Sequence, residues 1–339
     1  MEKFQDLFNR FSSLKVGVIG DVMLDTYMWG EVDRISPEAP VPIVSLKNKE
    51  QRIGGAGNVA LNTQSLGAKS YIISVMGDDE DASKLTSLLS AQNINCSYCI
   101  KSKDRITTNK TRVISRNQHM MRLDAEITDD LCKRDEERLI ELFERFVKTE
   151  KPDVVVLEDY NKGVLTETII QVVVSVCREA GVITAVDPKR KNFLQYKGVD
   201  IFKPNLKEVK EALNLLFSDI NLELLRDIHS ELTHLLHHRV SFITLSEKGV
   251  FFGEESRAAI IPSHLRNIAD VSGAGDTVIA VASLVFAVTN DVNLMAEVAN
   301  IAGGLVCEEV GTVAIDRQKL LHECGLLLAG SANFSFSGK

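Results

Sequence analysis

The chain lacks the excess of basic residues by which nucleic-acid-binding proteins hold a phosphate backbone. Its 39 lysines and arginines are outnumbered by 47 aspartates and glutamates, so the formal net charge is −8 at pH 7. A protein that binds DNA or RNA is expected to carry a basic face. The composition therefore argues against a nucleic-acid partner, although a local pocket can still hold a small anion.

Long hydrophobic runs and an N-terminal targeting signal are missing as well. The apolar stretch 278–288 has about half of the roughly 20 residues that a membrane-spanning helix needs. The N-terminus (MEKFQD) is not a basic region followed by an apolar core, as a signal peptide would be. The six cysteines are scattered along the chain, which is typical of reduced thiols. We therefore expect a cytoplasmic protein without a membrane partner.

Several catalytic motifs are also missing. The sequence contains no Walker motif G-x-x-x-x-G-K-[ST], no protein-kinase catalytic loop and no H-E-x-x-H zinc helix. These absences argue against a P-loop enzyme, a protein kinase and a zinc protease of that type. The chemistry of the chain must therefore be sought in other motifs.

Short apolar runs alternate with longer amphipathic segments over most of the chain. Runs typical of strands buried on both faces occur at 14–20, 71–75, 154–157, 182–186 and 241–245. Helical patterns lie between them, at 58–66, 81–91, 129–148, 166–180 and 206–216. Such alternation predicts an α/β fold with a mostly parallel sheet that is covered by helices on both faces. In such sheets ligands bind beyond the carboxyl ends of the strands.

Two segments, 25–47 and 95–123, break this alternation because they have strand-like patterns and no helix. We expect them to form a small separate sheet, inserted into a single domain of residues 1–330, that acts as a lid on the active face. Residues 331–339 are expected to form a flexible tail.

Residues 270–277 (DVSGAGDT) lie directly before the apolar stretch 278–288, which has the length of a helix. Glycines let the backbone turn tightly and approach a ligand closely. The N-terminus of a helix attracts anions through its unpaired N–H groups and its dipole. Asp276 lies in this anion-binding turn, where an acid would repel a bound phosphate unless its task is to accept a proton. The pattern therefore predicts a base that deprotonates a hydroxyl beside a phosphate, as in a kinase.

A second glycine cluster, residues 54–60 (GGAGNVA), also opens a predicted helix. Part of it fits the dinucleotide-binding pattern G-x-G-x-x-G/A, but that pattern should follow a buried strand. The preceding residues 49–53 (KEQRI) are too polar for one. We favour a turn that brings backbone amides and the Asn58 side chain close to sugar hydroxyls. Glycines that merely allow helix–sheet packing are the alternative.

Asn205 follows Pro204 at the start of the predicted helix 206–216. With Glu208 three residues later, it could form a capping box. Alternatively, Asn205 and Glu208 could hold the water shell of a Mg²⁺ ion near phosphates. The two roles are compatible, and both stay open at this point.

Three basic residues, Lys110, Arg112 and Arg116, occur at even spacing in a segment with a strand-like pattern. In a strand all three would face the same way. Such a face could simply be solvated, or it could receive a second phosphate carried by the substrate.

The two glycine motifs, 54–58 (GGAGN) and 270–276 (DVSGAGD), resemble the signatures of the ribokinase-like, or pfkB-type, carbohydrate kinases. Further motifs at 20–25 (GDVMLD), 34–42 (RISPEAPVP) and 115–118 (SRNQ) resemble the branch that acts on D-glycero-β-D-manno-heptose 7-phosphate. The resemblance extends from about residue 12 to about residue 320. In many organisms this kinase is fused to a nucleotidyltransferase. The chain has no H-x-G-H motif of such a domain, so we expect a stand-alone kinase.

The resemblance implies a three-layer α/β/α fold with a mostly parallel central sheet and a small β-sheet lid. It implies transfer of the γ-phosphate of ATP to the anomeric hydroxyl of heptose 7-phosphate, a step toward ADP-heptose and lipopolysaccharide. Mg²⁺ would accompany ATP, K⁺ is a further candidate cofactor, and a homodimer would form through the lid.

The resemblance also implies roles for individual residues. Asp276 would be the catalytic base, with the amides of Gly273, Ala274 and Gly275 around the transferring phosphate. The sugar and its distal phosphate would contact Asp21, Asp25, Gly54, Gly55, Asn58, Lys110, Arg112, Arg116 and Lys162. The nucleotide would contact Asn205, Leu206, Lys207, Glu208, Ser246, Gly249 and Asn300, together with Gly273 and Gly275. Asn205 and Glu208 would hold Mg²⁺ through water, and Asp270 would help bind a monovalent cation.

Two other functions stay open. The chain could be a ribokinase-like kinase for another sugar phosphate, such as a fructose phosphate. It could also be a non-catalytic sugar- or nucleotide-binding protein, because a fold does not determine a function. The presence of Asp276 argues against the second of these.

Overall fold

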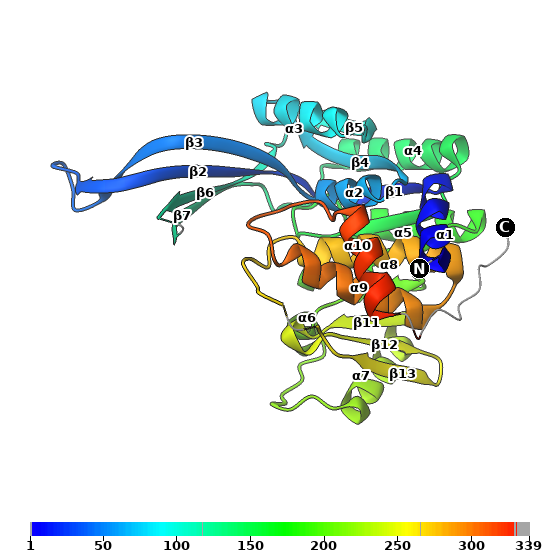
Figure 1. The fold of residues 1–339 in the computed structure, drawn as a ribbon. Coiled ribbons are helices and arrows are strands. Elements are labelled where there is room, and N and C mark those ends of the chain that lie inside the picture. Colours follow the sequence, from blue (N-terminus) through cyan, green and yellow to red (C-terminus); the bar gives the residue numbers. More distant parts are fainter. Residues whose placement is uncertain (1, 117, 265, 329, 331–339) are drawn as a thin grey trace.

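Figure 1 shows the computed structural model, which describes residues 2–116, 118–264, 266–328 and 330. The expected tail, 331–339, lies outside the described residues. Among the described residues, no helix is both long enough and apolar enough to span a bilayer.

A large sheet runs through the centre of the molecule, in the strand order β13-β12-β11-β10-β9-β8-β1-β4-β5. The strands from β11 to β5 are parallel, and β12 and β13 extend the sheet antiparallel at one edge. The predicted mostly parallel sheet is therefore confirmed. The bounds are β1 (Lys15–Gly20), β4 (Lys69–Gly77), β5 (Asn95–Ser102), β8 (Val154–Glu158), β9 (Ile183–Asp187), β10 (Ile201–Phe202), β11 (Val240–Thr244), β12 (Val250–Glu254) and β13 (Arg257–Ile261).

Helices cover both faces of this sheet (Figure 1), because its strands are apolar on both sides. In β8, Val154 and Val156 belong to one hydrophobic cluster, and Val155 and Leu157 belong to the other. The first cluster contains residues of α1 (Glu2–Arg10), α2 (Ala56–Ser65), α3 (Glu80–Ala91), α8 (Ala274–Thr289), α9 (Val292–Val306) and α10 (Arg317–Leu327). The second contains residues of α4 (Lys133–Glu150), α5 (Glu167–Ala180), α6 (Leu206–Ala212) and α7 (Leu222–Leu236).

Two helices are shorter than predicted. The helix expected from residue 129 begins at Lys133, because the amide of Leu131 instead bonds the carbonyl of Gly163. The helix expected to reach residue 216 ends at Ala212, and Asn214 then takes a left-handed conformation with a φ of 51°.

A small second sheet projects from the body (Figure 1), and we call it the lid. Its strands are β2 (Val22–Ile35), β3 (Pro42–Gly55), β6 (Thr108–Ser115) and β7 (Gln118–Ala125), in the order β3-β2-β6-β7. The long β2–β3 hairpin is antiparallel, and β6 runs parallel to β2.

The expected boundaries of the lid need correction. Residues 95–102 form β5, which pairs with β4 at the edge of the large sheet. The prediction was wrong because, in an edge strand that is buried on one face, apolar and polar residues alternate as they do in a lid strand. Tyr98 and Ile100 face the second hydrophobic cluster. The two lid segments are therefore 22–55 and 108–125.

Candidate active site

Asp276 lies in the first turn of α8, where the N-termini of α2 and α8 meet the carboxyl ends of the parallel strands. Its side chain is 4% exposed. Asn58, in the first turn of α2, donates a hydrogen bond from Nδ2 to Asp276 Oδ2 (2.8 Å). Tyr160, which follows β8, donates its hydroxyl to Asp276 Oδ1 (2.7 Å). Two elements far apart in sequence therefore orient the carboxylate predicted to be the base.

Burial raises the pKa of Asp276 to about 6, although the bonds from Asn58 and Tyr160 oppose the shift. At neutral pH the group is ionised, yet its pKa lies close enough to 7 for it to accept a proton readily. The geometry and the pKa thus both suit a general base.

Gly273 caps the N-terminus of α8 with a φ of 78°, a conformation that glycine adopts without strain. A Cβ at this position would lie 2.8 Å from Asn58 Nδ2. The Ala274 amide makes a long bond to the Val271 carbonyl (3.3 Å). The first amides of any α-helix have no partner within the helix, so they can face an anion.

A buried acidic cluster lies behind this turn: Glu158, Asp187 and Asp276 have carboxylate oxygens within 4.8 Å of one another. Lys203 Nζ lies 2.7 Å from Asp187 Oδ2, and Lys189 Nζ lies 3.4 Å from Asp187 Oδ1. Burial alone would raise the pKa of Asp187, but the two lysines outweigh it, and the pKa is lowered. The Asp187–Lys203 pair adjoins the predicted anion site, because a Cβ at Gly275 would lie within 3.7 Å of both groups.

Glu158 differs from its neighbours. Its side chain is fully buried, and neither carboxylate oxygen has a hydrogen-bond partner among the described residues. Burial and the charges of Asp187 and Asp276 raise the pKa of Glu158 well above its usual value. Burial therefore favours the protonated form of Glu158.

Asp21 has a structural task that the sequence did not reveal. Its Oδ2 accepts from the amides of Tyr160 (2.8 Å) and Lys162 (3.0 Å), and its Oδ1 accepts from the amide of Val164 (3.1 Å). The carboxylate therefore holds the loop that carries Tyr160. Contact of Asp21 with a sugar stays a prediction.

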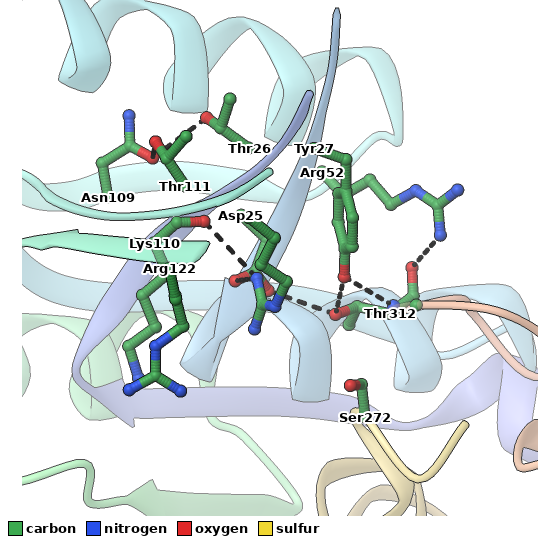
Figure 2. Close-up of polar contacts among 12 residues, drawn as sticks. Asp25, Thr26, Tyr27, Arg52, Asn109, Lys110, Thr111, Arg122, Ser272 and Thr312 are labelled. Carbon is green, nitrogen blue, oxygen red and sulfur yellow. Dashed lines mark hydrogen bonds and ion pairs between the residues drawn. The ribbon is translucent and has the colours of Figure 1, made fainter. Parts of the chain in front are cut away.

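The predicted basic residues separate into different environments. Arg112 is paired with Asp25 (2.6 Å), and Lys162 is paired with Glu126 (2.7 Å). Figure 2 shows Lys110 and Asp25 at the base of the lid. Gly54 lies against Asp25, since a Cβ there would be 2.5 Å from Asp25 Oδ2.

Lys110 has no ion pair among the described residues, and its Nζ lies 5.4 Å from the centre of the Tyr160 ring. Burial, assisted by the charge of Lys162, lowers the pKa of Lys110. Arg116 was expected to share the face of Lys110 and Arg112. It lies instead in the exposed turn after β6, with a φ of 49°, so that prediction of a common face was wrong for Arg116.

Most residues on the predicted nucleotide side lie at strand ends and helix starts, and Asn300 lies within α9. Asn205 and Glu208 form the predicted capping box at the start of α6, and Lys189 Nζ contacts Glu208 Oε1 (2.7 Å). Leu206 and Lys207 begin that helix, with Lys207 exposed and 3.8 Å from Glu211. Ser246 and Gly249 lie at the turn between β11 and β12, and Asn300 of α9 donates to the Pro262 carbonyl (2.9 Å). Their contacts with a nucleotide stay predictions.

Asp270 accepts hydrogen bonds from the amide and hydroxyl of Ser272 at Oδ1, and from the amide of Gly311 at Oδ2. It therefore ties the turn before α8 to the loop that follows α9. Its predicted role in binding a monovalent cation is untested.

Sequence reasoning missed Lys203, Lys189 and the pairing of Tyr160 with Asp276. Asp187 and Glu158 were visible as acids at the ends of predicted strands, where site residues gather. The lysines gave no signal, because the sequence does not show which loops meet.

Comparison with known proteins places this geometry in context. A family model described as pfkB family carbohydrate kinase matches residues 13–319. The bifunctional protein HldE of Aliarcobacter butzleri (strain RM4018) is 41% identical over 299 residues, covering 87% of this chain and 61% of that protein. HldE of Geotalea uraniireducens (strain Rf4) is 35% identical over 327 residues, covering 96% of this chain and 66% of that protein. The chain therefore spans less than two thirds of the length of these relatives.

Solved structures are similar in fold. Phosphofructokinase-2 from Escherichia coli in complex with potassium matches with a TM-score of 0.75 and 18% identity, covering 91% of this chain and 99% of the other. Ribokinase of Arabidopsis thaliana complexed with ribose and ATP matches with a TM-score of 0.69 and 16% identity, covering 91% and 98%. At these identities the likeness shows the fold alone, and it confirms the predicted ribokinase-like α/β architecture.

Proposed function

The chain belongs to the pfkB family of carbohydrate kinases, and we propose that it phosphorylates the anomeric hydroxyl of D-glycero-D-manno-heptose 7-phosphate. The product would be the 1,7-bisphosphate, a precursor of ADP-heptose in lipopolysaccharide synthesis. That the chain is a sugar kinase follows from the family. The choice of sugar rests on the branch-specific motifs and on relatives that are 41% and 35% identical to this chain over the aligned residues.

The position of Lys110 supports a phosphorylated acceptor most strongly. Lys110 and Lys162 repel each other near Tyr160, whose hydroxyl bonds Asp276. Two neighbouring ammonium groups, one of them without an ion pair among the described residues, favour an anion between them. A sugar with its anomeric hydroxyl at Asp276 would therefore carry its phosphate toward Lys110.

The reaction then follows from the residues at the start of α8. Asp276, oriented by Asn58 and Tyr160, takes the proton of the anomeric hydroxyl. The sugar oxygen forms a bond to the γ-phosphorus of ATP as the bond to the bridging oxygen breaks, and ADP leaves. The amides from Gly273 to Gly275 and the ammonium of Lys203 would stabilise the charge on the transferring phosphoryl group.

Kinases of this family use ATP with a divalent metal. Mg²⁺ binds carboxylate and amide oxygens, often through water that it retains. The side-chain oxygens of Asn205 and Glu208 are therefore suitable ligands for such an ion. When bound, Mg²⁺ would neutralise charge on the ATP phosphates. Lys189 holds the Glu208 carboxylate in place beside Asp187.

A steady-state panel tests the choice of acceptor. With Mg-ATP and the full chain, kcat/KM should be at least 100-fold higher for heptose 7-phosphate than for fructose 6-phosphate, ribose or unphosphorylated heptose. ³¹P NMR of the product should show the new phosphate on the anomeric carbon. A higher kcat/KM for fructose 6-phosphate would contradict the proposal. ATP binding without turnover of any sugar would favour the non-catalytic alternative.

We also propose a homodimer through the lid. β7 is exposed along its whole length and forms one edge of the sheet, with Met120, Met121 and Leu123 among its exposed apolar side chains. Ile35 and Leu46 are exposed on the β2–β3 hairpin. Exposed apolar side chains beside an unpaired strand edge favour association. Light scattering should give the mass of a dimer, and Met121→Glu should give that of a monomer. A monomeric wild-type chain would contradict this proposal.

A further inference from the structure

The turn 310–312, which lies after α9, contacts both the lid and the start of α8. On the lid side, Arg52 of β3 donates from Nη1 to the carbonyls of Val310 (2.9 Å) and Thr312 (3.3 Å). The amide of Thr312 donates to the hydroxyl of Tyr27 of β2 (3.2 Å). Figure 2 shows Tyr27 and Arg52 side by side above Thr312. Two lid strands therefore hold this turn.

The same turn reaches the acceptor side of the site. Thr312 donates its hydroxyl to Asp25 Oδ2 (3.1 Å), and Asp25 Oδ1 is paired with Arg112 (2.6 Å). The guanidinium carbons of Arg112 and Arg52 lie 5.2 and 4.9 Å from the centre of the Tyr27 ring. A change at Asp25 therefore bears on the same side chains that hold the turn.

On its other side the turn is tied to the anion site. The amide of Gly311 donates to Asp270 Oδ2 (2.9 Å), and Asp270 Oδ1 binds the amide and hydroxyl of Ser272. Ser272 directly precedes Gly273, the N-cap of α8. A Cβ on Gly273 would also lie 3.2 Å from Thr312 Cγ2. The turn thus packs directly against the start of α8.

Gly311 lies between the lid side chains and Asp270. Its φ is 74°, and a Cβ there would lie 2.7 Å from Arg52 Nη1 and 2.9 Å from the Tyr27 hydroxyl. Side chains of the lid therefore lie against the turn at Gly311, with no room for a Cβ between them.

We propose that the turn 310–312 couples the lid to the anion site, with Tyr27 and Arg52 as positioning residues. Occupation of the anion site by the nucleotide phosphates shifts the lid through this turn. By thermodynamic reciprocity, an acceptor bound at Asp25 changes the affinity of the anion site for the nucleotide by the same factor by which the nucleotide changes the affinity for the acceptor. The inference deepens the proposed function, because it requires that the start of α8 bind the phosphates of ATP, but it does not depend on which sugar is used.

The chain carries its own reporter of this coupling. Trp29 is its single tryptophan and lies on β2. Its ring stacks on that of Tyr27, with 5.6 Å between centroids and 17° between planes. Movement of Tyr27 should therefore change the emission of Trp29.

The test uses the Mg²⁺ complex of AMP-PNP, a non-hydrolysable ATP analogue, and the full chain without sugar. At saturation the analogue should change Trp29 emission in the wild type. Tyr27→Phe keeps the ring but removes the hydroxyl that accepts from Thr312, so the fractional change should fall by at least half. Arg52→Met, which removes both carbonyl contacts, should have the same effect. In both variants the Kd from calorimetry should stay within about threefold of the wild type.

Tyr71→Phe is the matched control, because the Tyr71 hydroxyl bonds Glu150, a residue of α4 far from the turn in sequence. It should leave the emission change intact. AMP-PNP binding without an emission change in the wild type would overturn the coupling. So would equal fractional changes in the wild type, Tyr27→Phe and Arg52→Met. Absence of binding in calorimetry would refute the proposed function, and the inference with it.

Discussion

At the start of α8 the reactive groups are buried in the body of the molecule, whereas the lid carries its polar groups on a projecting sheet. Asp276 and Asn58 are almost fully buried, but every residue of β7 is exposed. Burial allows the body to shift a pKa and to strengthen charge interactions. The exposed strand β7 cannot do this, but an exposed strand of the lid can close over and select a ligand. We therefore propose that the body carries out the chemistry and that the lid selects the acceptor.

The charges follow the same division. The body gathers acids, with Glu158, Asp187 and Asp276 close together, while the base of the lid supplies Lys110 and Arg112. Acids suit proton transfer and metal binding, and basic groups suit recognition of a phosphate. Variants in the body should therefore lower kcat, whereas variants in the lid should mainly lower kcat/KM for the acceptor.

Among the variants that leave Asp276 in place, the largest effect is expected from Gly273→Ala in the body. Its Cβ would displace Asn58 from Asp276 and disturb the amides that we propose to face the phosphoryl group. Loss of one such donor lowers kcat by about 10²–10³, so we expect a loss of at least about 10²-fold. Steady-state kinetics measures this. Gly181→Ala is the control. Gly181 also has a positive φ (67°), but open space surrounds its Cβ position, so kcat should stay unchanged.

A lid variant should change affinity rather than chemistry. Lys110→Met removes the basic group that we place at the distal phosphate, and kcat/KM for the phosphorylated acceptor should fall by about 30–100-fold, as for loss of a charged hydrogen bond. The kcat at saturating acceptor should stay within about threefold. Arg116→Met, in the exposed turn, should change neither value more than about threefold. An equal effect of the two variants would break the assignment of the distal phosphate to Lys110.

The body should also be less stable because it buries the carboxylate of Asp276. The pKa of Asp276 is about 6 in the folded chain and about 4 when unfolded. The wild type is therefore penalised above pH 6, where the buried group is ionised, and not below pH 4, where it is protonated in both states. Asp276→Asn should raise the free energy of unfolding by up to about 3 kcal/mol at pH 8. Urea titrations should show this gain in unfolding free energy at pH 8 and its loss at pH 4. A gain that persists at pH 4 would contradict the assignment of the penalty to the ionised Asp276.

The smallest effect is expected at Glu158. Because burial favours the protonated form of Glu158, we expect Glu158→Gln to replace one neutral group by another of similar shape. Both kcat and the unfolding free energy at pH 7 should change little, by less than about threefold and about 1 kcal/mol. A tenfold change in kcat would show that Glu158 carries a charge that the reaction uses.

The sequence was sufficient for the parallel sheet, its helices and the two glycine turns, because these depend on local patterns that the residues themselves display. It assigned β5 to the lid, because an edge strand alternates as a lid strand does. It placed Arg116 in a strand, although the chain turns there. The bonds from Tyr160 to Asp276 and from Thr312 to Tyr27 join segments more than a hundred residues apart, and no local pattern predicts them.

The central claim is that Asp276 removes the proton from the acceptor hydroxyl. The most direct test compares turnover with nucleotide binding in Asp276→Asn. The acceptor is the sugar for which the wild type has the highest kcat/KM. General base catalysis is worth about 10²–10⁴ in rate, so kcat should fall at least about 100-fold. The Kd for Mg-AMP-PNP should stay within about threefold of the wild type. A kcat within tenfold of the wild type would contradict the claim.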